Sequence, residues 1–550
     1  MRFFSLLLLL NLSLFAEVTL DAIHDKPPSL AKNFMIWRFL HQDITPAEAD
    51  EAFYQFRDVD TRLFKAYAKK SDREEVIYTA ECLSMSTQEL SKSNDISCVK
   101  MAFSPSKAFA MREEERNRLA RLLDENRTYT WIEMMDDLLQ TKRITDLRKY
   151  KPSTFMYLFL SGGMNFRETY LNRPLPSSYL QEIPKHWGFE RFVVLVVTDS
   201  RYAKLQEELL KVGADTKMSS EAHFYLAMNA LEHEQKQNAL AHLKKVHELA
   251  YYRSHKDKAL FWQYLVTKDR KILEQLGKSV DINMYSLYAK EKLGVEVTNF
   301  YTHLPTHENN TTKADLTDPF VWNELLIEVK KTPKKDLKKL AAKYANDEMM
   351  PLYSFIYEKA TDYKEMGFIM PYNRYMQDLS NDDKAIYYAL MRQESRFIPA
   401  ALSRSYALGL MQMMPFLVKA LDKSFKDERL SYDEMFNPEK NIAYAKKHIN
   451  WLKKSLYHPV LMAYAYNGGI GFTKRYITKE NCFANEKYEP FMSMEMMANS
   501  ESREYGKKVL SNYVIYKKIL GDKVSIVALF DMLLQPAQCD RFRAPKQAKR

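Results

Sequence analysis

The sequence predicts an all-α protein. Only 13 of the 550 residues are Gly, whereas 46% are hydrophobic and 28% are charged. Turn-rich β architectures use more Gly, and this hydrophobic content is typical of folded chains. Apolar residues also recur at helical spacing through most of the chain. Because a single core rarely extends over so many residues, we expect two or three domains.

The first 16 residues are typical of a secretory signal peptide. Arg2 provides the positive end, Phe3–Phe15 form a short apolar run, and Ala16 is a candidate last residue before cleavage. The run is too short to cross a bilayer comfortably, and no later stretch resembles a membrane span. We therefore expect an exported protein of a bacterial periplasm, either free or loosely associated with the outer membrane or cell wall.

The four cysteines are compatible with an oxidising compartment. Cys82 and Cys98 are close in sequence, as in a local disulfide, and we predict that they pair. Cys482 and Cys539 are a second candidate pair, which the sequence leaves open. The alternative is four buried thiols, and the spacing does not resemble a metal site.

The formal net charge of +11 predicts a basic surface. Such a surface would attract an anionic polymer. A Lys-rich background composition explains the charge equally well. No recognised nucleic-acid motif accompanies it, so nucleic acid is not an expected partner.

Residues 17–301 are expected to form a superhelical domain of successive amphipathic helices. Thr45–Glu48 has the pattern of a capped helix start. Ala222–Ala250 reads as two paired helices of the kind that stack into a solenoid, although no fixed repeat length is visible. Phe192–Val197 could be a strand by composition, but its helical surroundings favour a buried helix.

Three further regions follow. The polar segment 302–318 lacks apolar periodicity and reads as a linker. Helices then resume in a small linker domain, 319–370. We expect a lysozyme-like catalytic domain over 371–521 and a C-terminal tail over 522–550.

One stretch of the last domain organises the prediction of function. A helix capped by Ser380 or Asn381 is expected to run to about Ser395, so that Glu394 lies at its end. A loop should follow, with a second helix from about Leu410.

Glu394 is the candidate acid of a sugar-cleaving site. Cleavage of a glycosidic bond requires protonation of a poor leaving group, and a carboxyl group kept neutral by burial can supply the proton. On its own, Glu394 would be read as an ordinary surface residue near a helix end. No Asp or Glu occurs between 395 and 421 to act as a second carboxylate, although a more distant one could fold back into the site.

Three sequence blocks, in the right order, change that interpretation. The first is Arg392–Ser395 with Gly409–Pro415 after it, the second is Ala465–Gly469, and the third is Ser500–Arg503 with Tyr505. Together they resemble the signature of the soluble lytic murein transglycosylases, whose chains combine a superhelical front with a lysozyme-like catalytic domain. The region around Tyr285, Ala289 and Gly294 resembles the front domain of that family more weakly.

A few positions depart from the family pattern. Tyr406 stands where the family usually has Gly, Ala498 and Asn499 replace a Pro-Phe pair, Gly506 replaces Val, and Ile470 replaces Pro. These differences concern loop shape and substrate contacts rather than the acid.

The resemblance implies a reaction and a partner. Glu394 would protonate the oxygen between N-acetylmuramic acid and N-acetylglucosamine, and then take the proton of the muramoyl O6 hydroxyl as this oxygen closes onto C1. The product would be a 1,6-anhydromuramoyl end, formed without water. Glycan strands of peptidoglycan are the expected partner, no cofactor or metal is implied, and a monomer is expected.

Further residues of the blocks are candidates for substrate binding: Ser395, Ser403, Gln412, Met414, Tyr466, Asn467 and Glu501. The serines could hydrogen-bond the acid or a sugar, and the amides suit N-acetyl and hydroxyl groups. Met414 and Tyr466 could form a wall for a sugar ring, and Glu501 could bind substrate or position Tyr466. For each of them, the alternative is a role in holding the fold.

Two other functions remain as alternatives. One is a goose-type lysozyme-like hydrolase, which would add water at the cleaved bond. The other is a non-catalytic periplasmic scaffold built on the solenoid. The sequence does not distinguish cleavage at chain ends from cleavage inside strands.

Overall fold

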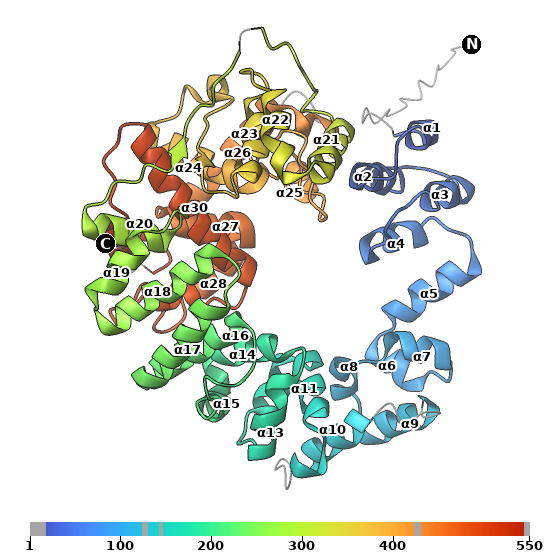
Figure 1. Ribbon diagram of the computed structural model, residues 1–550. Coiled ribbons are helices and arrows are strands. Elements are labelled where there is room, and N and C mark those ends of the chain that lie inside the picture. Colours follow the sequence, from blue (N-terminus) through green and yellow to red (C-terminus); the bar gives the residue numbers. More distant parts are fainter. Residues whose placement is uncertain (1–17, 124–129, 142–146, 308, 423–430, 544–550) are drawn as a thin grey trace, which may run out of the picture. The chain divides into compact units, whose positions relative to one another are not determined.

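Helices dominate the computed structural model (Figure 1). The model describes residues 18–123, 130–141, 147–307, 309–422 and 431–543. In this part of the chain the strands form one two-stranded sheet, so the all-α prediction is confirmed. The predicted signal peptide lies outside the described residues. None of the described helices is both long and apolar enough to cross a membrane.

The chain folds as two compact units, each built from two separate stretches. The first unit comprises Met1–Ile77 and Phe300–Lys454, and the second comprises Tyr78–Asn299 and Ser455–Arg550. Each unit therefore combines N-terminal helices with a part of the predicted catalytic domain, 371–521.

Within its described residues, the first unit contains four N-terminal α-helices and six later ones. Their bounds are α1 Leu20–His24, α2 Leu30–Phe39, α3 Pro46–Phe53, α4 Thr61–Ala68, α21 Pro319–Lys331, α22 Leu337–Ala342, α23 Met350–Ala360, α24 Asn381–Ser395, α25 Pro415–Asp422 and α26 Pro438–Lys453. Strands β1 (Phe300–Tyr301) and β2 (Met366–Gly367) pair in parallel. Helix α5 (Glu74–Ser84) begins in this unit and ends in the second.

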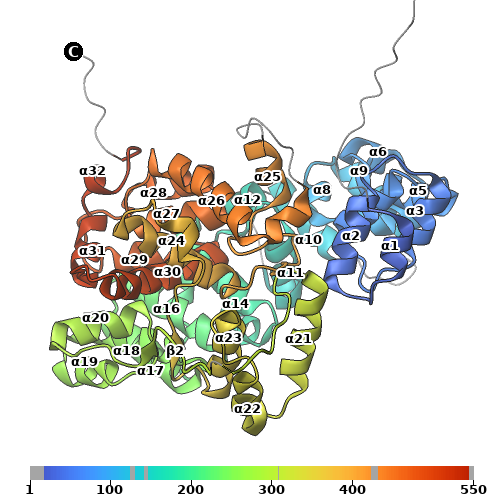
Figure 2. The same cartoon turned by 90° about the horizontal axis from the view of Figure 1, so that it is seen from above.

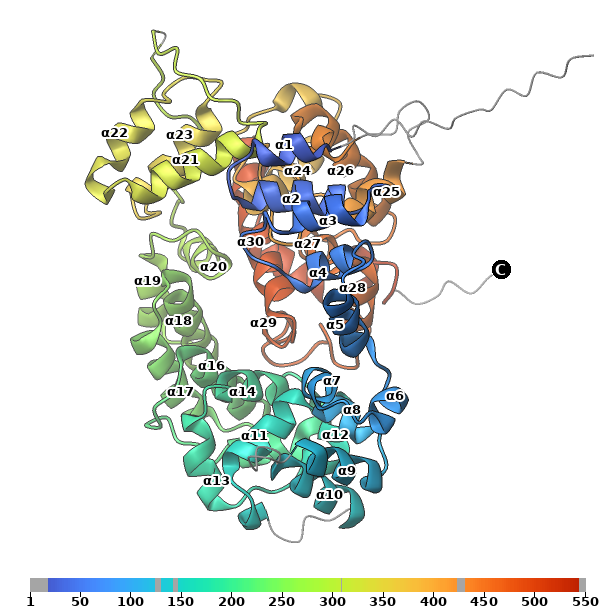
Figure 3. The same ribbon diagram turned by 90° about the vertical axis from the view of Figure 1, so that its right-hand side faces the viewer.

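Helices α1–α4 pack around a small apolar core and form one group (Figure 3). Ile23 and Ile36 are fully buried in this core, and Tyr67 stacks on Phe53 with ring centres 3.8 Å apart. Thr45 and Glu48 form the predicted capping box at the start of α3. The apolar faces of α1–α4 are thus buried against one another.

Helices α21–α23 follow the predicted linker and lie together (Figure 2). Trp322 of α21 packs edge-on against Phe355 of α23 at 5.2 Å. The described residues of 302–318 form neither helix nor strand, as expected. Leu316 is nevertheless buried, and its carbonyl accepts a hydrogen bond from the Ala400 N–H at 2.8 Å. This segment is therefore attached to the loop after α24.

Helix α24 ends at Ser395, as the sequence predicted, and Ser380 caps its start. The prediction of a second helix from about Leu410 is wrong, because α25 begins only at Pro415. Leu408 and Met413 exchange two backbone hydrogen bonds, and Gln412 has a φ of 48°. A residue with positive φ cannot continue a right-handed helix, so the loop extends to Met414.

The second unit contains the remaining helices. Their bounds are α6 Thr87–Lys92, α7 Ile96–Ala102, α8 Pro105–Phe109, α9 Glu113–Leu123, α10 Thr130–Thr141, α11 Pro152–Ser161, α12 Met164–Phe166, α13 Ser177–Glu182, α14 Phe189–Val197, α15 Ala203–Leu209, α16 Ser220–Glu232, α17 Lys236–Leu249, α18 Arg253–Thr267, α19 Arg270–Gly277, α20 Met284–Leu293, α27 Pro459–Gly468, α28 Ile470–Ile477, α29 Phe491–Glu495, α30 Ser500–Ile519, α31 Ile526–Leu533 and α32 Pro536–Cys539.

Successive helices from α16 to α20 pack on one another in chain order (Figure 1). The predicted helical pair within Ala222–Ala250 corresponds to α16 and α17. Phe192–Val197 lies in α14, so the prediction of a buried helix is confirmed despite the β-branched residues. Helical context overrides strand composition here because Phe192, Val193 and Val196 all face the core.

Helices α27 and α30 approach closely at Gly506. A Cβ at this position would lie 2.2 Å from Cε1 of Tyr464, which is closer than atoms can approach. The family usually has Val here. The absence of a side chain therefore makes room for the buried Tyr464 ring.

The described part of the C-terminal tail contains α31 and α32. Cys482 and Cys539 are both free thiols. The Cys539 thiol donates a hydrogen bond to the Met532 carbonyl at 2.9 Å. The second pair that the sequence left open is therefore not a disulfide.

The predicted disulfide between Cys82 and Cys98 is present and joins α5 to α7. Replacement of both cysteines by Ala should lower the free energy of unfolding by about 3 kcal/mol, because the unfolded chain regains the freedom of the closed loop. Urea titration followed by circular dichroism would measure the change. Cys482→Ala, which removes a free thiol, is the control. An unchanged midpoint after reduction with dithiothreitol would contradict the prediction.

The buried His458 should make stability depend on pH. Its Nδ1 accepts the Val460 N–H at 3.2 Å, so Nε2 carries the proton and donates to the Leu529 carbonyl at 2.9 Å. Burial lowers the pKa of His458 to about 3. The unfolded chain, with a His pKa near 6.5, binds a proton first, so stability should be lost as pH falls from about 6.5 toward 3.

His458→Asn keeps an acceptor for the Val460 N–H but cannot titrate. The loss of stability between pH 6.5 and pH 4 should shrink by at least about 1.4 kcal/mol, the equivalent of one pKa unit. Thermal melts across this range measure it. The exposed His303→Asn is the control. Parallel pH profiles for wild type and the His458 variant would refute the prediction.

Candidate active site

Glu394 is the penultimate residue of α24 and is half-buried. The two residues after the helix, Arg396 and Phe397, both have positive φ, at 54° and 68°. Successive non-glycine residues in this region are uncommon and occur where the surrounding structure imposes them, frequently at functional sites. The chain therefore turns sharply just after Glu394.

Arginines on both sides of Glu394 bind one buried glutamate. Arg392 Nη2 donates to Glu358 Oε1 at 2.9 Å, and Arg396 donates to Glu358 Oε2. The Gly367 N–H also donates to Oε1, at 2.7 Å. Glu358 belongs to α23, in the predicted linker domain, and nothing in its sequence surroundings pointed to this role. The end of α24 is thus attached firmly to α23.

The hydroxyls of Ser395 and Ser403 bind the backbone of the loop. Ser395 Oγ accepts from the Phe397 N–H at 3.1 Å. Ser403 Oγ accepts from the N–H groups of Ser405 at 3.2 Å and Ala407 at 2.9 Å. Both serines therefore hold the loop after α24, and contact with substrate stays a prediction for each.

Gln412 has one half of its amide engaged. Nε2 donates to the carbonyls of Ala401 at 3.0 Å and Gly409 at 2.8 Å. No group within the described ranges donates to its Oε1. The side chain is half-buried and held in place, so Oε1 is an oriented acceptor of the kind that an N-acetyl N–H requires.

Asn441 of α26 supports the same loop, a role that no sequence pattern predicted. Its Nδ2 donates to the carbonyls of Leu408 at 3.0 Å and Met435 at 2.8 Å, and its Oδ1 accepts from the Met411 N–H at 2.9 Å. Gly409 has a φ of 73°, and a Cβ there would lie 2.1 Å from the Met435 carbonyl oxygen. The loop geometry therefore requires glycine at this position.

Met414 immediately precedes α25 and lines a groove of about 470 Å³. Tyr406, the departure from the family pattern, also lines this groove and is buried. Burial raises the pKa of its hydroxyl, so Tyr406 stays neutral.

The predicted site residues of the second unit also meet one another. Asn467 lies at the end of α27, and its Nδ2 donates to Glu501 Oε1 at 3.2 Å. Ser502 donates from Oγ to Asn467 Oδ1 at 2.7 Å. Tyr466 precedes Asn467 and is half-buried, whereas Glu501 is exposed. The second and third sequence blocks are thus joined through Asn467.

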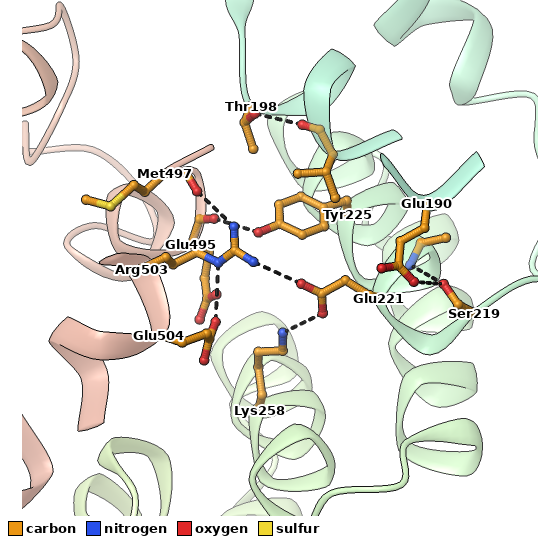
Figure 4. Close-up of polar contacts among 12 residues, drawn as sticks. Glu190, Thr198, Ser219, Glu221, Tyr225, Lys258, Glu495, Met497, Arg503 and Glu504 are labelled. Carbon is orange, nitrogen blue, oxygen red and sulfur yellow. Dashed lines mark hydrogen bonds and ion pairs between the residues drawn. The ribbon is translucent and has the colours of Figure 1, made fainter. Parts of the chain in front are cut away.

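Arg503 of the third block is held in a buried network (Figure 4). It donates from Nη2 to Glu221 Oε1 at 3.0 Å and from Nη1 to the Met497 carbonyl at 2.8 Å. Its Nε contacts Glu504 at 3.2 Å. Lys258 donates to the other oxygen of Glu221, at 3.1 Å. Arg503 therefore attaches α30 to α16 and α18 rather than presenting its charge to solvent.

Glu495 is a second centre of this network and is fully buried. Lys507 binds its Oε2 at 2.5 Å, and the Tyr285 hydroxyl donates to its Oε1 at 2.5 Å. The Tyr225 hydroxyl donates to its backbone carbonyl at 3.0 Å. Burial together with the charge of Glu495 raises the pKa of Tyr285, which stays a donor. Tyr285 lies in α20, in the region that weakly resembles the family's front domain. Its hydrogen bond to Glu495 thus connects this region to the predicted catalytic domain, 371–521.

Comparisons with known proteins identify a domain in this chain and relatives that are similar to it. Residues 371–489 match the family model of the Transglycosylase SLT domain. The Escherichia coli protein named soluble lytic murein transglycosylase is 23% identical over 299 residues, which cover 50% of this chain and 45% of that protein. Membrane-bound lytic murein transglycosylase C of Pectobacterium atrosepticum is 29% identical over 155 residues, which cover 25% and 43%. The chain spans less than half the length of these relatives.

Similarity of structure extends further along the chain. The crystal structure of the 70 kDa soluble lytic transglycosylase of Escherichia coli aligns over 95% of this chain and 85% of that one, with a TM-score of 0.50 and 16% identity. The fold is therefore shared with that protein. The predicted resemblance to the lytic murein transglycosylases is therefore confirmed for residues 371–489, which form a Transglycosylase SLT domain.

Proposed function

We propose that the chain is a peptidoglycan lytic transglycosylase that cleaves the β-1,4 bond between N-acetylmuramic acid and N-acetylglucosamine. The observation that carries this proposal is the position of Glu394. It lies in the last turn of α24, inside the matched domain, and arginines on either side of it fix the helix end through Glu358. The Glu394 carboxyl group is thereby held on a rigid element.

The reaction uses this carboxyl group twice. In the first half, Glu394 gives its proton to the glycosidic oxygen and the bond to C1 breaks. In the second half, the carboxylate takes the proton of the O6 hydroxyl while O6 bonds to C1 of the same sugar. The proton lost is thus regained, no water is consumed, and a 1,6-anhydromuramoyl end results. The N-acetyl oxygen of the sugar can stabilise the positive charge at C1 between these steps.

A hydrolase of the goose-lysozyme type is the second candidate, and it would need a group to activate water. The hydrogen bonds of two carboxylates of the first unit argue for the lyase. Glu358 receives two guanidinium groups and a backbone N–H, and Asp422 accepts from the Tyr444 hydroxyl at 2.9 Å. Carboxylate oxygens that already accept these hydrogen bonds are less available to bind and orient a water molecule.

Other residues of the site would bind the glycan. Gln412 offers Oε1 to an N-acetyl N–H, while Tyr466 and Met414 offer apolar surface. Asn467 and Glu501 would act as one unit because they are hydrogen-bonded. The cellular site of this activity would be the periplasm, where the glycan strands lie, and we expect the chain to act as a monomer without a cofactor.

Glu394→Gln tests the mechanism directly. The amide cannot donate and retrieve the proton, so lytic activity on purified peptidoglycan should fall by about 100-fold to 10,000-fold. Mass spectrometry should show that wild-type products end in anhydromuramoyl groups, one water lighter than hydrolysis products. Glu439→Gln, on α26, is the control. Full activity of the Glu394 variant, or reducing ends in the wild-type products, would refute the proposal.

Glu358→Gln tests whether the end of α24 must be fixed. The change leaves two arginines without their buried counter-charge, which should cost about 3–5 kcal/mol of stability. We also expect kcat to fall more than KM rises, since the acid rather than the binding surface is displaced. Thermal unfolding and steady-state turnover of glycan strands measure both effects.

Glu348→Gln is a matched control, because Glu348 pairs with Lys313 at 2.8 Å on the surface. Exposed pairs contribute only about 0–1 kcal/mol. Equal stability and turnover in the Glu358 and Glu348 variants would show that the buried pair does not position Glu394.

A further inference from the structure

The groove beside Met414 has walls from two distant parts of the sequence, both within the first unit. Helices α2 and α4 contribute Trp37 and Arg62. The loop before α25 contributes Tyr406, and α25 itself contributes Phe416. Tyr432, which follows α25 in the chain, lines the groove as well.

Tyr406 forms the floor of this groove and joins its two sides. Only 2% of the residue is exposed, and its ring lies 5.2 Å from Phe34 and 5.5 Å from Trp37. The Arg62 guanidinium lies over the same ring at 4.7 Å. The Tyr406 side chain, where the family has Gly, therefore attaches the N-terminal helices to the catalytic loop.

Aromatic faces remain open above this floor. Phe416 is 71% exposed in the first turn of α25, an unusual position for a large apolar side chain. Trp37 and Tyr432 are half-buried, with ring centres 6.3 Å apart. An aromatic surface that the described residues leave uncovered is suited to a flat ligand with apolar faces.

Polar groups are available at the edges of these rings. The Trp37 indole N–H, the Arg62 guanidinium, the Tyr432 hydroxyl and the Ser405 hydroxyl make no hydrogen bond to any residue that the structure describes. Pyranose sugars have apolar faces formed by C–H groups and edges formed by hydroxyls. A groove with aromatic faces and free donors at its rim matches this chemistry.

We propose that this groove is a further subsite, in which an N-acetylated sugar of the glycan strand stacks on Phe416 and Trp37. Arg62 pairs with a carboxylate of the peptide stem that the sugar carries. Its guanidinium has one face on Tyr406, which leaves the N–H edge for bidentate binding. The subsite is continuous with the loop that holds Gln412 and rests on the proposed function, because it assumes a peptidoglycan strand as the ligand.

Phe416→Ala tests the stacking. Calorimetric titration with tetrasaccharides of alternating N-acetylglucosamine and N-acetylmuramic acid, in a Glu394→Gln background that prevents cleavage, should show about 10-fold weaker binding, whether or not the sugars carry stem peptides. Because Phe416 is exposed, the variant should melt as its parent does. Trp451→Ala, which removes another exposed ring of the first unit, is the control and should bind normally.

Arg62→Gln tests the charge pair. It should weaken binding of the stem-bearing tetrasaccharide about 10-fold and leave the stem-free one unchanged. Arg57→Gln, with a side chain that is 70% exposed in the same N-terminal region, is the matched control. Equal affinity for the stem-bearing ligand in the Arg62 variant, or equal losses for both ligands, would overturn the assignment of Arg62.

The two proposals fail in different ways. Absence of anhydromuramoyl ends from wild-type digests would refute the proposed function. Anhydromuramoyl ends from wild type together with unchanged tetrasaccharide affinity in Phe416→Ala would refute the subsite alone. The expected result is anhydromuramoyl ends from wild type and weakened binding in the Phe416 and Arg62 variants.

Discussion

Buried charges in this protein must be paired, and this constraint holds predicted site segments in place within each unit. In the first unit, Glu358 receives Arg392 and Arg396. In the second, Glu221 receives Arg503 and Lys258. Each glutamate comes from a helix outside the three sequence blocks. Loss of either glutamate would remove the paired carboxylate of a buried cation, Arg392 or Lys258, which is far more costly than the loss of a surface pair.

The pairing separates two kinds of residue within the family blocks. In the proposed function, Glu394 and Gln412 are the residues that act on the ligand. Arg392 and Arg503, only a few positions from predicted site residues, are consumed by structural contacts. The Ser403 hydroxyl likewise accepts hydrogen bonds from the backbone of its own loop. A sequence block of this family thus contains both proposed site residues and residues whose side chains hold the fold in place.

Local patterns predicted the elements that local interactions determine. The limits of α24 follow from the Ser380 cap and the chain reversal after Ser395, and the helix at Phe192–Val197 follows from its helical surroundings. The start of α25 was misplaced because the loop before it is held by Asn441, far along the chain. The role of Glu358 was not predicted either, because it depends on a contact between distant residues. Hydrophobic periodicity does not indicate which distant residue will pair with a buried arginine.

Tyr406, a departure from the family pattern, strains the backbone of its loop but adds buried aromatic surface. A non-glycine residue at a φ of 64° costs about 1–2 kcal/mol, and glycine would avoid this cost. Burial of a large aromatic ring against Phe34 and Trp37 contributes a comparable or larger amount. The loop conformation therefore depends on α2 and on Arg62 of α4. A catalytic domain bounded at 371–521 would lack these contacts, so the cooperative unit around Glu394 includes helices from the opposite end of the sequence.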